Sequence, residues 1–126
     1  MDLTSIDHLL SAAHGYVELE MYPEALKAME GLPPSCGVDP SVISMRLLLC
    51  AGMKNWETGR MFLHLVRPNH PKPHREAAGF FHLAHAEALC AAGDAAGAQA
   101  AMESLTLIWP EGRSRALELL ATMGVI

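Results

Sequence analysis

The chain has 126 residues, of which 51% are hydrophobic, 18% charged and 6% aromatic, and its 14 acidic and 9 basic side chains give a net charge of -5. A chain of this length buries roughly two thirds of its unfolded surface, so it can fold as one domain without a disulfide or metal. The negative charge argues against the basic surface typical of nucleic-acid binding, so we expect no nucleic-acid partner. Because Ala, Leu and Met supply most of the apolar content, helices are favoured over sheets.

The first ten residues contain acidic side chains and lack the basic and apolar regions of a signal peptide. No segment reaches the roughly 18 consecutive apolar residues that a membrane span requires. The cysteines, Cys36, Cys50 and Cys90, are odd in number and widely spaced, which favours reduced thiols over disulfides. These features predict a cytoplasmic protein that does not bind membranes.

Seven helices are predicted in chain order from apolar residues at spacings of three and four. The second helix begins near Pro23, because proline is tolerated in a first helical turn, and it ends at Gly31–Pro34. The remaining helices are expected at 4–19, 41–52, 56–66, 75–92, 95–108 and 114–123.

An internal repeat relates these helices in pairs. Small residues occupy matching positions at Ala25, Gly59 and Ala98, with separations of 34 and 39 residues. The five extra residues are assigned to the segment Arg67–His74, which contains three prolines. Because proline disrupts a helix, this whole segment is expected to form an extended connection.

In this register the chain resembles the tetratricopeptide repeat family, in which each unit is a pair of antiparallel helices. The second copy departs from the family pattern at Arg46 and Leu47. The resemblance implies an all-α fold, a short right-handed α-solenoid of three antiparallel helix pairs at 4–34, 41–71 and 75–110, with a C-terminal capping helix at 114–123. The matching residues are Leu9, Ala13, Tyr16, Ala25, Met29 and Leu32 in the first copy, Gly59, Leu63, Val66 and Pro71 in the second, and Ala86, Leu89, Gly93, Ala98, Met102, Leu105 and Pro110 in the third.

The resemblance also implies a concave groove lined by the first helix of each pair. Relatives that bind an acidic C-terminal carboxylate use lysine, arginine and asparagine in this groove, and none occurs at the matching positions here. The groove is therefore expected to be an apolar strip with a few polar groups. Its expected lining is Asp7, Leu10, His14 and Val17 from the first copy, Ser41, Ser44, Leu48 and Ala51 from the second, and Phe80, Leu83 and Glu87 from the third.

Such a strip suits an apolar extended peptide or the amphipathic helix of a partner. The expected function is non-catalytic protein–protein interaction, as an adaptor, an assembly factor or a chaperone-like protein. A second copy of the chain is the alternative occupant, which would make a homo-oligomer, because a mean hydropathy of +0.18 leaves much apolar surface to cover.

The rival hypothesis is a small helical metal-binding or catalytic domain. It rests on His70, His74, His82 and His85, whose spacings could supply imidazoles to zinc. Prolines between the first two prevent them from sharing a helical face, and the last two fall at packing positions. Structural imidazoles are therefore the preferred interpretation, and no metal or cofactor is expected.

No common catalytic motif is present, so we expect no enzymatic activity. Cys50 and Cys90 lie on apolar helical segments without a basic neighbour and are expected to be buried thiols. Near the helix ends, Met53, Met61 and Phe62 are the large apolar residues expected on the surface.

Overall fold

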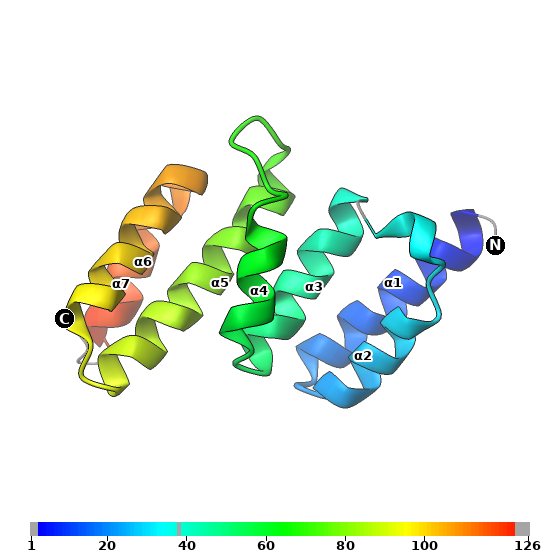
Figure 1. The fold of residues 1–126 in the computed structure, drawn as a ribbon, viewed down its shortest axis with the longest axis horizontal. Coiled ribbons are helices and arrows are strands. Elements are labelled where there is room, and N and C mark those ends of the chain that lie inside the picture. Colours follow the sequence, from blue (N-terminus) through cyan, green and yellow to red (C-terminus); the bar gives the residue numbers. More distant parts are fainter. Residues whose placement is uncertain (1–2, 38, 123–126) are drawn as a thin grey trace. The chain divides into compact units, whose positions relative to one another are not determined.

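The computed structural model describes residues 3–37 and 39–122, with side chains from residue 6 onward. These residues contain no strand, and the predicted all-α class is confirmed (Figure 1). Short 3-10 turns, η1 (Pro34–Cys36) and η2 (Pro110–Gly112), precede α3 and α7. The helices are α1 (Leu3–Glu18), α2 (Tyr22–Glu30), α3 (Pro40–Gly52), α4 (Trp56–Leu63), α5 (Lys72–Ala91), α6 (Ala95–Ile108) and α7 (Arg113–Thr122).

Most helix ends lie within one residue of their predicted positions, but the connection between α4 and α5 differs. Helix α4 ends at Leu63 rather than at residue 66, and α5 begins at Lys72 rather than at residue 75. Pro73 therefore lies in the first turn of α5, and the prediction that all three prolines lie outside helices was wrong. The first turn tolerates proline because its N–H has no intrahelical acceptor there. The predicted last residue of the final helix, Met123, lies outside the described residues.

The chain divides into two compact units, one extending to Leu65 and the other beginning at Val66. The N-terminal unit contains α1 to α4, and the C-terminal unit contains α5 to α7. Helices α1 and α2, α3 and α4, and α5 and α6 each pack together within a unit.

The turns inside the three helix pairs have the same backbone conformation. Each contains one residue with positive φ, which is 58° at Glu20, 57° at Lys54 and 82° at Gly93. The next residue in each turn donates its N–H to a carbonyl five residues earlier, at 2.8 Å in all three cases. These turns are separated by 34 and 39 residues, as are the small residues Ala25, Gly59 and Ala98.

The core of the N-terminal unit begins where α1 and α2 approach at alanines. Ala13 and Ala25 are both fully buried, so the helices meet with almost no side-chain bulk between them. Helix α3 packs on both helices of this pair. The fully buried Met29 and the apolar residues Val42, Met45 and Leu49 complete this core.

The C-terminal unit repeats the alanine contact and adds an aromatic centre. Ala86 is fully buried between α5 and α6, together with Ala98 and Ala101. Trp109 packs where α7 joins the pair, and glycine at 79 and at 112 leaves room for its indole ring. The cluster around this ring consists of Leu83, Leu105, Trp109, Ala116 and Leu120.

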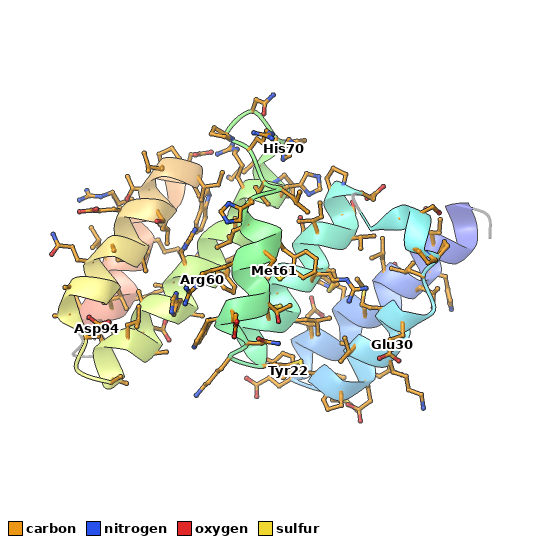
Figure 2. The ribbon with its side chains drawn as sticks, in the orientation of Figure 1. Tyr22, Glu30, Arg60, Met61, His70 and Asp94 are labelled. Carbon is orange, nitrogen blue, oxygen red and sulfur yellow. The ribbon has the colours of Figure 1, made fainter. Side chains whose placement is uncertain are left out.

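Arg75 ties the proline-rich connection to the end of α6. Its two terminal nitrogens each donate to a carboxylate oxygen of Glu111 at 2.9 Å, and its Nε donates to the carbonyl of His70 at 3.0 Å. The hydrogen bonds from Arg75 lower the pKa of the Glu111 carboxyl to about 2. Figure 2 labels His70 in this connection.

Within residues 3–37 and 39–122, no helix is both long enough and apolar enough to cross a membrane. All three cysteines are free thiols.

We predict that Ala25→Trp and Ala98→Trp each lower the free energy of unfolding by about 1–3 kcal/mol or more, because an indole cannot fit where paired helices touch. Ala100→Trp is the matched control, since Ala100 is exposed on the same helix as Ala98. Urea unfolding followed by circular dichroism measures the difference. Equal stability of the buried and exposed variants would contradict the helix contacts described above.

Candidate functional site

A cavity of about 340 Å³ lies in the N-terminal unit between α1, η1 and the start of α3. It brings together Asp7, Leu10 and Ser41, three residues that the sequence placed on the concave strip. Asp39 also lines it and caps α3, its carboxylate accepting the Ser41 N–H at 2.9 Å. The rest of the lining is Ile6, Ser35 and Cys36.

The other predicted groove residues of this unit lie on the same two helices. Val17 is half-buried and packs partly against the N-terminal core, as Leu10 does. His14 is exposed, and its Nδ1 lies 3.3 Å from the Glu18 carboxylate one turn later. Ser44, Leu48 and Ala51 are half-buried on α3.

In the C-terminal unit the prediction fails for one residue. Leu83 is only 6% exposed and packs in the core with Trp109 and Leu120, so it is not a groove residue. The reason is that side chains from the end of α6 and from α7, namely Leu105, Trp109, Ala116 and Leu120, form one buried cluster with it. Phe80 is 40% exposed, with its ring centroid 5.4 Å from that of Trp109, and Glu87 is half-buried.

A larger cavity, about 450 Å³, lies between α6 and α7 with the end of α5 at its base. This cavity was not predicted from the sequence. The one available signal is that Ala95 and Gln99 stand where the first copy has the bulkier Tyr22 and Leu26. The lining is Cys90, Ala95, Ala98, Gln99, Met102, Glu103, Thr106, Arg113, Leu117 and Leu120.

The four histidines at 70, 74, 82 and 85 are not brought together as a set of metal ligands. No three His, Cys, Asp or Glu side chains among the described residues are placed to hold a metal ion, and all four histidines are among them. His70 instead accepts a hydrogen bond at Nδ1 from the backbone N–H of Arg67 at 3.1 Å, within its own loop. The structure therefore gives the rival metal-binding hypothesis no ligand set.

Two ionisable side chains on the helices have pKa values that are shifted so as to favour the uncharged form. Burial, with a smaller contribution from His85, lowers the pKa of His82 to about 4. Burial raises the pKa of the Cys50 thiol, and Arg46, four residues earlier on α3, opposes this increase. The expectation that Cys50 has no basic neighbour was therefore wrong. At neutral pH the His82 imidazole is therefore uncharged, and burial disfavours the thiolate of Cys50, which is the nucleophilic form of cysteine.

Exposure was predicted for Met53, Met61 and Phe62 and burial for Cys50 and Cys90, and three of these five predictions are confirmed. Met53 is 45% and Met61 is 70% exposed, the latter on α4 in Figure 2, and Cys50 is buried. Phe62 and Cys90 are half-buried, so the expectations of an exposed ring and of a buried thiol were wrong. Cys90 is accessible because the α6/α7 cavity opens beside it.

No protein-family model matches the chain, and neither curated proteins nor solved structures show a significant match to it. The resemblance to tetratricopeptide repeats accordingly stays a prediction from its residues.

Because the pKa of His82 is lower in the folded state than the value of about 6.5 expected when unfolded, its contribution to stability is complete above about pH 6.5. That contribution is lost as the pH falls toward 4. Wild type should therefore lose unfolding free energy between pH 6.5 and pH 4. We predict that this loss is smaller in His82→Gln by up to about 3 kcal/mol. Urea titrations between pH 4 and 7 measure the difference, with exposed His64→Gln as the control. Parallel pH profiles for wild type and His82→Gln would contradict the assignment.

We further predict that EDTA leaves the melting temperature unchanged, because a structural metal would contribute folding free energy directly. Differential scanning calorimetry with and without the chelator measures this. A decrease of several degrees, reversed by added zinc, would restore the metal hypothesis.

Proposed function

We propose that this chain is a non-catalytic protein-binding module built as a short right-handed α-solenoid. It resembles a tetratricopeptide repeat protein and acts as an adaptor, assembly factor or chaperone-like protein. Its concave strip consists of Leu10, His14, Val17, Ser44, Leu48, Phe80 and Glu87, without Leu83.

The observation that carries the proposal is the cavity shared by Asp7, Leu10 and Ser41. These residues belong to the first helices of two successive pairs. Their common cavity supports the expectation that these helices present one continuous surface. The positive φ and the shared hydrogen bond of the three turns support a repeated helix pair as the building unit.

The chemistry of this cavity favours an apolar segment with a basic residue beside it. Ile6 and Leu10 provide apolar contact, whereas Asp7 and Asp39 are exposed carboxylates. A partner carrying lysine or arginine next to its apolar residues therefore complements both parts of the surface.

A display selection from a random peptide library tests the proposal with the whole chain as bait. We predict enrichment of peptides that combine apolar residues with lysine or arginine. Asp7→Lys should weaken a selected peptide about fivefold to tenfold, because it reverses the charge that the peptide faces. Glu30→Lys is the control, since Glu30 is exposed on α2 and lines neither cavity.

A second pair of variants tests the apolar strip. Leu48→Glu combined with Phe80→Glu should keep the circular dichroism spectrum and lose the selected peptides, because a carboxylate is costly in an apolar contact. Leu107→Glu is the matched control, because Leu107 is 79% exposed on α6 outside the strip. If the double variant stays folded and binds as well as wild type, the strip is not the binding surface. If light scattering shows a wild-type oligomer that the double variant dissociates, the occupant is a second copy.

A further inference from the structure

The α6/α7 cavity exists because the two outer helix pairs differ in bulk at matching positions. A separation of 73 residues aligns the positive-φ residues Glu20 and Gly93. The same separation aligns Ala25 with Ala98, and both are buried. Helices α2 and α6 therefore match in the conformation of the preceding turn as well as in sequence position.

In this alignment Tyr22 corresponds to Ala95. The Tyr22 ring lies against Gly52, where even a Cβ would overlap it, and it packs on the N-terminal core (Figure 2). Ala95 is exposed at the start of α6 and lines the cavity. An aromatic ring that fills space in one unit has no counterpart in the other.

The neighbouring positions show the same loss of bulk. Leu26 packs on the N-terminal core, whereas its counterpart Gln99 is exposed at the cavity. Met29 is fully buried, whereas its counterpart Met102 is only half-buried. The cavity is thus apolar space of the kind that a ring and a branched chain occupy in the N-terminal unit.

Two opposite charges line this space. Glu103 on α6 and Arg113 at the start of α7 are both exposed, and within the described residues neither side chain forms an ion pair or a hydrogen bond. The Thr106 hydroxyl donates to the Met102 carbonyl at 2.9 Å and keeps its oxygen lone pairs as acceptors. A ligand carrying one positive and one negative group complements this lining.

We propose that the α6/α7 cavity binds a zwitterionic aromatic small molecule of the size of an amino acid. Its ring packs against Met102, Leu117 and Leu120. Its carboxylate pairs with Arg113 and its ammonium with Glu103. The cavity volume of about 450 Å³ lies within the range of roughly 300–1,000 Å³ typical of small-molecule sites. This site lies wholly within the C-terminal unit and is independent of the concave strip.

The probe is phenylalanine, titrated into the uniformly ¹⁵N-labelled full chain and followed by amide NMR shifts. We expect saturable shifts confined to α6, α7 and the end of α5, with a dissociation constant on the order of millimolar for so small a ligand. Phenethylamine lacks the carboxylate and 3-phenylpropionate lacks the ammonium, so each should bind at least about threefold more weakly.

Charge variants separate the two contacts. Arg113→Gln should remove the preference for phenylalanine over phenethylamine, and Glu103→Gln should remove the preference over 3-phenylpropionate. Arg115→Gln is the control, because Arg115 is exposed on α7 and does not line the cavity. Equal affinity of the three probes for wild type, or preferences unchanged in the variants, would overturn the zwitterion assignment.

Filling the cavity tests the aromatic part separately. Ala95→Tyr with Gln99→Leu copies the N-terminal unit and should raise the melting temperature while weakening phenylalanine binding at least about tenfold. Ala96→Tyr is the control, since Ala96 is exposed and lies outside the cavity. If the double variant does not fold, Gln99→Leu alone should still weaken binding. Absence of saturable shifts in wild type, or undiminished binding by the folded filled variant, would overturn the site.

Discussion

The close contact of paired helices at alanine is the constraint on which the rest of this structure depends. Ala13 meets α2 near Ala25, and Ala86 meets α6 near Ala98, with exposures between 0% and 5%. At these points no side chain holds the helices apart, so larger residues on either side of the contact can interdigitate. Each first helix is followed by a turn with one residue at positive φ, and this turn sets the direction in which the second helix runs back along the first.

Because the alanine contact involves only a few positions, the other positions of the second helix can carry different side chains in different pairs. In α2 the outer positions carry Tyr22 and Leu26, and they pack on the N-terminal core. In α6 the matching positions carry Ala95 and Gln99, and a cavity opens toward α7. The helix pairs α1/α2 and α5/α6 therefore share a turn conformation and an alanine contact but present different residues on their second helices.

Charge has a limited and local part in this fold. The bidentate contact between Arg75 and Glu111 joins the first turn of α5 to the chain just after α6. Elsewhere, burial moves His82 and Cys50 toward their neutral forms.

The sequence by itself determined the helices, their pairing turns and the small residues between them, because these depend on neighbours within about one turn of chain. It predicted both ends of α6 correctly and most other helix ends to within one residue. It did not determine that Pro73 enters α5, that Leu83 is buried with Trp109 and Leu120, or that Ala95 and Gln99 line a cavity. Those features depend on which distant side chains meet. A leucine at helical spacing is equally compatible with an open strip and a core, and only the buried cluster that Leu83 forms with Trp109 and Leu120 decides between them.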